Sequence, residues 1–406
     1  MAKQLRMLAP EAFREHLSRR AFITGGTAAA GFAVVLAACG GSEEESSSDG
    51  GSGGEAASGD YSRVINKSSG SLAMYTWGDY NDPEIVGSLA ESELGVTMKV
   101  DYYPSNEDLI TKLAASNGNS GFDIVVPTGP YVPQMIEKGL IQKLDMSKLP
   151  NFGNIDTAYV SQAWDPNNEY SVCKNWGSTG YFYNKTKITR KMETWQDFID
   201  ACMNEGSGDC AMIDTAPNLC GMWYWANGHN WNDQEPAKLD ACEKFLVDEF
   251  AQHIKAFDSY PSTKLAEGAY SLAMGWNGDL RQAYVRIADA GGNPDEWVWV
   301  LGAPATELWM DTYCIAAGAP NPDAAHAWIN WELVPEISIK DLQYHGYNTG
   351  MKNMDSLIAE IAPDLERGEM IFFSPEQVAT FQTQEIAPSL DRMVDIYNKV
   401  KAKAGA

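Results

Sequence analysis

The feature that most constrains the fold is a threefold succession of strand, turn and helix in the first half of the chain. Buried strands are predicted at Ser71–Trp77, Val96–Tyr103 and Phe122–Val126, where the sequence alternates or runs apolar. A helical pattern follows each strand, and Ser105 is placed to cap the second helix. Strands that alternate with helices in this way predict a parallel α/β sheet, in which ligands bind beyond the carboxyl ends of the strands.

The remaining sequence predicts a second lobe. A chain of 406 residues exceeds one ordinary single-core domain, so we expect two lobes. Extended chain at Tyr170–Tyr183 predicts a crossing into the second lobe, and Leu308–Tyr313 predicts the return. The expected fold is therefore α/β, with parallel-rich sheets joined by crossing hinge strands. The predicted boundaries are residues 61–174 plus 312–346 for the first lobe and 175–311 plus 347–406 for the second.

The N-terminal residues predict an export signal and a tether. Ser18–Ile23 resembles a twin-arginine signal, and Leu36–Cys39 resembles a bacterial lipoprotein cleavage box. We therefore expect residues 1–38 to be a signal peptide and Cys39 to carry a lipid that holds the protein on the outer side of the cell membrane. Residues 39–60 are rich in Gly, Ser and acid, and predict a disordered tether. Outside the N-terminus no apolar run is long enough to span a bilayer.

The charge balance excludes one class of partner. Thirty Lys and Arg residues face 55 Asp and Glu residues, for a formal net charge of −25. Nucleic-acid binding requires a cationic face, so we expect no nucleic-acid partner. An acidic surface raises the local concentration of small cations, but it is equally typical of solubility or of a saline habitat.

The cysteines leave several arrangements open. Besides Cys39 there are six, an even number that permits disulfides in an exported domain. The spacing favours a local bridge between Cys202 and Cys210, and less strongly one between Cys220 and Cys242. Buried free thiols are the alternative. The sequence lacks the close Cys and His spacings of a metal site, so no metal is predicted.

Three segments share a Trp at or near a predicted strand end, followed within two or three residues by Asp. They are Trp77–Asp79, Trp276–Asp279 and Trp309–Asp311. An indole face stabilises a cation by roughly 0.5–1 kcal/mol when exposed and about 2 kcal/mol when desolvated. A carboxylate at about 4 Å adds on the order of 4 kcal/mol at an effective dielectric near 20. A single such segment is typical of a core edge beside a solvated cap, but three together favour a site for an ammonium group.

From Ser71 to the C-terminus the chain resembles the periplasmic polyamine-binding proteins of ABC importers, the spermidine- and putrescine-binding family. The resemblance implies a two-lobed, type II-like periplasmic binding protein fold that closes on a ligand, no cofactor, no catalytic residue, and an ABC permease as partner. We expect the protein to act as a monomer. The matching stretches are Tyr75–Tyr80, Phe122–Met135, Gly139–Asp145, Asp165–Tyr170, Trp276–Asp279 and Trp309–Asp311.

The family's ligand contacts can be carried over residue by residue. Tyr347 matches a Tyr of the third crossing, with Tyr344 as the nearby alternative. The candidate ligand-binding residues are Trp77, Asp79, Tyr80, Tyr131, Asn218, Trp276, Asp279, Trp309, Asp311 and Tyr347.

Two departures from the family pattern affect the expected ligand. The acidic residue of the second lobe falls on Asn218, with Thr215 where spermidine binders tend to have Asp. The Tyr that follows the third strand falls on Pro130, which leaves Tyr131. Loss of carboxylates lowers the charge available to a long triamine, so we expect a putrescine-like diamine or agmatine rather than spermidine.

Two other classes of function would use similar residues. A receptor for a sugar or another small amine would also use Trp platforms, and a secreted glycoside hydrolase would use paired carboxylates. From Tyr61 on, the sequence shows no Gly-x-Ser-x-Gly or His-Glu-x-x-His motif, and the five His residues of the chain are scattered. The expectation is therefore a binding protein and not an enzyme.

Overall fold

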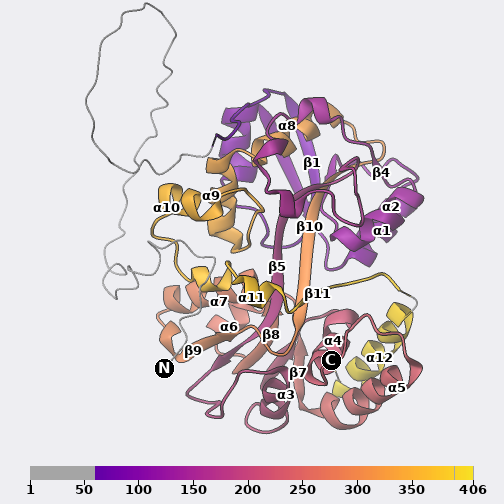
Figure 1. Ribbon diagram of the computed structural model, residues 1–406, viewed down its shortest axis with the longest axis vertical. Coiled ribbons are helices and arrows are strands. Elements are labelled where there is room, and N and C mark those ends of the chain that lie inside the picture. The colour runs from indigo at the N-terminus through magenta and orange to yellow at the C-terminus, as the bar shows by residue number, and fades with distance from the viewer. Residues whose placement is uncertain (1–59, 388, 406) are drawn as a thin grey trace, which may run out of the picture.

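The computed structural model describes residues 60–387 and 389–405. The predicted signal peptide, Cys39 and the tether up to residue 59 lie outside these residues. Figure 1 shows two α/β lobes, one above the other along the long axis, with strands β5 and β10 running between them. Within these described residues, no helix combines the length and the hydrophobicity that a membrane span requires.

The first lobe is built on a short parallel sheet. Strand β1 pairs in parallel with β2 and β3, as the strand–helix alternation predicts. The Ser105 side chain accepts a hydrogen bond from the Asp108 amide and caps helix α1, which confirms the predicted cap. The elements are β1 (Gly70–Thr76), β2 (Val96–Tyr102), α1 (Asn106–Ala115), β3 (Ile124–Val125), α2 (Val132–Glu137), β4 (Ile141–Gln142), α8 (Pro322–Glu332), α9 (Pro335–His345) and α10 (Met354–Ile361).

The second lobe repeats this architecture around strand β6, which pairs in parallel with β7 and β8. Its elements are α3 (Trp195–Met203), β6 (Cys210–Met212), α4 (Ala216–Ala226), α5 (Pro236–Lys244), β7 (Ile254–Phe257), α6 (Ser262–Ala266), β8 (Leu272–Trp276), α7 (Asn277–Asp289), β9 (Trp297–Val300), α11 (Pro375–Val378), β11 (Phe381–Thr383) and α12 (Ser389–Ala404).

Two long antiparallel strands join the lobes. Strands β5 (Val172–Asn184) and β10 (Thr306–Ala316) pair with each other, with a register shift between Asp311 and Thr312. At one end β10 pairs with β3 of the first lobe, and at the other end β5 pairs with β8 of the second. The continuous strand order is β2-β1-β3-β10-β5-β8-β6-β7. The predicted α/β fold with crossing hinge strands is therefore confirmed.

The chain's return to the second lobe comes later than expected. Residues 347–406 were expected in the second lobe, but Met351 and Leu357 share a buried core with Tyr61 and Ile339. Helix α10 lies beside α9 in the upper lobe of Figure 1. The apolar face of α10 therefore packs on elements of the first lobe, and the chain reaches the second lobe only after this helix.

Neither disulfide proposed from the spacing is present. Six cysteines in the described residues are buried thiols. The Cys202 thiol hydrogen-bonds with that of Cys210, and the Cys242 thiol with that of Cys220. The spacing thus identified the correct neighbours, but they pack as thiol pairs in the apolar core of the second lobe.

A buried ion pair holds the hinge strand β5 against helix α9. The Lys174 Nζ lies 2.9 Å from Asp341 Oδ2, and both side chains are 2 % exposed. Asp341 also accepts a hydrogen bond of 2.7 Å from the Asp82 amide. Burial alone would raise the Asp341 pKa, but Lys174 and His345 hold it well below its ordinary value.

We predict that Lys174→Met destabilises the protein by about 3–5 kcal/mol, because Asp341 would remain buried without its cation. Urea unfolding at pH 7 measures the free energy of unfolding. The matched control is Arg63→Met, which removes the cation from the exposed pair that Arg63 forms with Glu336 on the same helix α9. That change should cost no more than about 1 kcal/mol. Equal losses in the two variants would contradict the prediction.

Candidate functional site

A cavity of about 340 Å³ lies between the two lobes. Its wall is drawn from both lobes and from the crossing strands, so segments far apart in sequence meet there. Nine of the ten predicted ligand-binding residues line it: Trp77, Tyr80, Tyr131, Asn218, Trp276, Asp279, Trp309, Asp311 and Tyr347.

Strand β10 supplies one wall through alternate residues. Glu307, Trp309 and Asp311 are two apart, so their side chains leave the same face of the strand, and all three line the cavity. Trp309 is paired with Gly177 of β5. A Cβ atom at Gly177 would lie 2.4 Å from Trp309 Cζ2, so only glycine lets this indole lie over the neighbouring strand.

Asp311 lies at the hinge end of this wall. Its Oδ2 accepts a hydrogen bond of 2.5 Å from the Tyr80 hydroxyl. Burial raises the Asp311 pKa to about 6, while hydrogen bonds from Tyr80 and Thr128 and the charge of Lys174 oppose the rise. The Lys174 Nζ lies 4.6 Å from the centre of the Tyr80 ring, and both residues are buried.

Asp279 enters the cavity from the first turn of helix α7, directly after strand β8. Its carboxylate accepts a hydrogen bond from the Tyr347 hydroxyl. The Asp279 backbone amide in turn donates a hydrogen bond of 3.2 Å to the hydroxyl oxygen of Tyr347. Burial raises the Asp279 pKa to about 7, and the negative charge of Asp79 adds to the rise. The Tyr347 hydrogen bond acts in the opposite direction.

Glu307 is a cavity carboxylate that the sequence analysis missed. Its Oε2 accepts hydrogen bonds of 2.6 Å from Thr179 Oγ1 and 2.6 Å from Asn218 Nδ2. Burial raises the Glu307 pKa to about 7, these two bonds oppose the rise, and the charge of Asp311 adds to it. A search for acids on the same strand face as Trp309 and Asp311 could have found it, because Glu307 lies two residues before that Trp.

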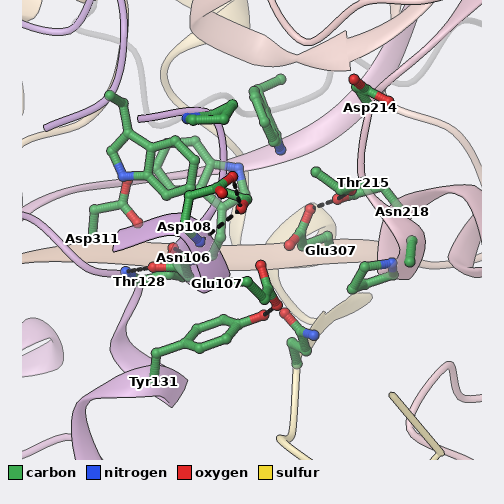
Figure 2. A pocket seen from close by; sticks show the side chains of 18 of the residues that line it. Asn106, Glu107, Asp108, Thr128, Tyr131, Asp214, Thr215, Asn218, Glu307 and Asp311 are labelled. Carbon is green, nitrogen blue, oxygen red and sulfur yellow. Dashed lines mark hydrogen bonds between the residues drawn. The ribbon is translucent and has the colours of Figure 1, made fainter. Parts of the chain in front are cut away.

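The Asn218 side chain is therefore hydrogen-bonded to other side chains of the same protein. Its amide nitrogen donates to Glu307, and its Oδ1 accepts a hydrogen bond of 2.5 Å from Thr215 Oγ1. Helix α4 thus brings an amide to the place where the resemblance implied an acid, and β10 brings the acid. Figure 2 shows Glu307 beside Thr215 and Asn218, and Asp311 on the other side of the view.

Aromatic side chains form the other walls. Trp77 and Trp276 meet edge to face with ring centres 6.3 Å apart, and Trp309 meets Tyr347 at 4.7 Å. Tyr260, also missed from the sequence, comes from the second lobe and accepts a hydrogen bond of 3.3 Å from the amide of Gly78.

Tyr131 is a buried residue of the cavity wall that contacts both lobes. Its hydroxyl donates to Glu107 Oε1 at 2.8 Å, as Figure 2 shows, and Gln384 of the second lobe also hydrogen-bonds with it. Tyr131 therefore links the two lobes beside the cavity.

Of the ten predicted ligand-binding residues, Asp79 is the one that does not line the cavity. It has a left-handed backbone with φ of 51°, and its side chain is 42 % exposed. Its Oδ2 lies 3.1 Å from Arg286 Nη2 of helix α7, and its carbonyl accepts a hydrogen bond from Gln282. The expectation that Asp79, Asp279 and Asp311 converge is therefore wrong for Asp79, which instead forms an ion pair between the lobes.

The charged side chains that line the cavity are all acidic. Among the described residues no Lys, Arg or His side chain lines the cavity. The acids Asp279, Glu307 and Asp311 are buried in it, with 5 %, 6 % and 5 % exposed. The residues that the structure describes also contain no group of three or more His, Cys, Asp or Glu side chains arranged to hold a metal ion. Such a cavity stabilises an organic cation that has apolar surface.

We predict that Glu307 makes the protein, without added ligand, less stable as the pH rises. The folded-state pKa of about 7 lies above the ordinary value of 4.5, so the folded state holds the proton more tightly. This contribution is fully present below about pH 4.5 and is lost by about pH 7, at most about 3 kcal/mol. Urea unfolding from pH 4.5 to 8 measures it. Glu307→Gln should make the profile less steep, while Asp279 and Asp311, whose pKa values are also raised, keep part of the slope. Parallel profiles for the two proteins would contradict the prediction.

The chain resembles known solute-binding proteins along most of its length. The model of the bacterial extracellular solute-binding protein family matches residues 84–366. A spermidine/putrescine-binding periplasmic protein of Escherichia coli (strain K12) is 29 % identical over 334 residues, which cover 82 % of this chain and 92 % of the relative. A putrescine/agmatine-binding protein of Pseudomonas aeruginosa is 28 % identical over 329 residues, which cover 78 % of this chain and 88 % of the relative.

The fold is shared with solved structures. The crystal structure of the TpPotD lipoprotein of Treponema pallidum matches with a TM-score of 0.69 and 25 % identity, covering 81 % of this chain and 99 % of that one. The interlobe cavity, the crossing strands and the family match agree with one another. The chain therefore belongs to the family of bacterial extracellular solute-binding proteins and has their two-lobed periplasmic binding protein fold.

Proposed function

We propose that the protein binds a linear polyamine between its lobes and delivers it to an ABC import permease. The observation that carries the proposal is a cavity with three buried carboxylates, Asp279, Glu307 and Asp311, and no cationic side chain among the described residues of its wall. A buried carboxylate without a cation is unfavourable, so a ligand that supplies ammonium groups is stabilised there. The names of the relatives, which bind spermidine, putrescine or agmatine, support the same ligand class.

The aromatic walls suit the rest of such a ligand. The methylene chain of a polyamine is apolar and packs against indole faces, while its ammonium groups take up cation–π and carboxylate contacts. Trp77, Trp276 and Trp309 supply those faces around the carboxylates. A sugar would leave the three acids without compensating charge.

Glu307 supplies negative charge that a longer ligand would need. The preference for a short diamine or agmatine rested on the missing carboxylates at Asn218 and Thr215. Glu307 brings a carboxylate to within 2.6 Å of the Asn218 amide, so the acid is replaced from a different element. The proposal therefore covers diamines, agmatine and triamines alike.

Closure of the lobes is the proposed response to binding. The ion pair of Asp79 with Arg286 and the hydrogen bond from Gly78 to Tyr260 both join the lobes beside the cavity. A ligand that contacts Trp77 of the first lobe and Asp279 of the second at once bridges the lobes only in the closed form, and so favours that form. The closed protein would then dock on the permease.

Calorimetry and thermal-shift measurements test the proposal. Putrescine, agmatine and spermidine should raise the melting temperature, and a panel of amino acids and neutral sugars should not. A turnover assay on aryl glycosides run beside them should show no product. A shift with a sugar and none with any polyamine would overturn the proposal, as would hydrolysis.

We predict that Asp311→Asn weakens polyamine binding by about 2–4 kcal/mol, because the ligand's ammonium group would be buried without its carboxylate. Asp79→Asn is the comparison, since it removes an acid from a half-exposed ion pair outside the cavity wall. It should weaken binding by no more than about 1 kcal/mol. Calorimetry measures both, and a larger loss for Asp79→Asn would contradict the assignment of the two residues.

We also propose that Cys39 is lipidated after twin-arginine export, so that the tether of residues 39–60 holds the binding lobes at the membrane. The Leu36–Cys39 box supports this, and a structural relative is itself described as a lipoprotein. In cells, Cys39→Ser should move the exported protein from the membrane fraction to the soluble extracytoplasmic fraction. Replacing Arg19 and Arg20 with Lys should instead leave the protein inside the cell. Membrane retention of the Ser variant would contradict lipidation.

A further inference from the structure

Glu307 differs from the other two buried acids of the cavity in what surrounds it. The positive charge of Lys174 opposes the rise of the Asp311 pKa, and that of Arg286 opposes the rise of the Asp279 pKa. Glu307 is hydrogen-bonded by the neutral groups of Thr179, Asn218 and Trp276. Within the described part of the chain it forms no ion pair.

The hydrogen bonds leave part of the carboxylate available. The bonds from Thr179 and Asn218 both end on Oε2. A carboxylate accepts several hydrogen bonds over its two oxygens, so Glu307 retains capacity for a donor from the cavity. Asn218 in turn is fixed by Thr215, and Thr179 lies on the crossing strand β5. The Glu307 side chain is thus held in place before any ligand arrives.

Glu307 and Asp311 also lie at different positions along the cavity. It lies four residues from Asp311 on β10, which separates their Cα atoms by about 13 Å. The indole of Trp309 leaves the same strand face between them. The same cationic group is therefore not expected to neutralise both acids.

We propose that Glu307 is the binding residue for a second cationic end of the ligand, so that the site selects amines charged at both ends over amines charged at one. Asn218 and Thr179 are its positioning residues. This inference rests on the proposed polyamine function and adds to it an acid that strand β10, and not helix α4, supplies.

The contact between Glu307 and Asn218 offers a direct test. Exchanging the two functional groups, as Glu307→Gln with Asn218→Asp, keeps an amide hydrogen-bonded to a carboxylate across the same 2.6 Å contact. The negative charge moves by one hydrogen bond toward helix α4 and remains in the cavity wall, since both residues line it.

Calorimetry with putrescine and with N-acetylputrescine, which has the same carbon chain and one cation, measures the effect. Displacement titration is used for the weaker ligand. Glu307→Gln should lower putrescine affinity by roughly 10- to 100-fold and change N-acetylputrescine affinity by less than about threefold. The double variant should recover at least about tenfold of the putrescine loss.

The matched control is Glu332→Gln. Glu332 is a buried acid of helix α8 that does not line the cavity. Its replacement should leave both affinities within about threefold, with melting curves confirming that each variant folds.

The possible outcomes are distinct. Equal losses for the two ligands in Glu307→Gln, or no loss for either, would overturn the role of Glu307. So would a double variant that binds putrescine no better than Glu307→Gln does. Wild-type protein that binds no polyamine would instead overturn the proposed function itself.

Discussion

The structure depends on negative charge that is buried without a cationic partner in the same cavity wall. Asp279, Glu307 and Asp311 lie in a cavity whose described wall holds no Lys, Arg or His side chain. Neutral donors, chiefly Tyr80, Tyr347 and the Thr179–Asn218 pair, stabilise these acids only in part, and the pKa values remain raised. The same desolvation that lowers stability without a ligand makes a cationic ligand favourable, so stability and affinity are linked through one set of groups.

Strand β10 connects this electrostatic constraint to the fold. It forms half of the hinge, and it carries Glu307, Trp309 and Asp311 on one face. Gly177 on the paired strand makes room for the Trp309 indole. Because the hinge strand itself supplies the site, a change in the angle between the lobes moves the walls of both lobes relative to these three side chains. Lobe closure and ligand contact therefore cannot be separated in this architecture.

The fold could be predicted from the sequence because each strand and helix is encoded by a short stretch of neighbouring residues. Alternating strands and helices and the Ser105 cap are fixed by neighbours in the chain. The Trp-then-Asp pattern found Asp279 and Asp311, but it also selected Asp79, which turns outward through a left-handed backbone to meet Arg286. That outcome depends on a partner about 200 residues away, so no local pattern reveals it.

Glu307 was missed for a related reason: it precedes its Trp, and its partner Asn218 lies 89 residues away. The two acids of β10 also differ in character. Lys174, whose Nζ lies 4.6 Å from the centre of the Tyr80 ring, opposes the rise of the Asp311 pKa, whereas only neutral donors oppose the rise of the Glu307 pKa. A cationic ligand group beside Glu307 would therefore supply there the kind of charge that Lys174 already supplies near Asp311. The two acids thus contribute to binding in different ways along one strand.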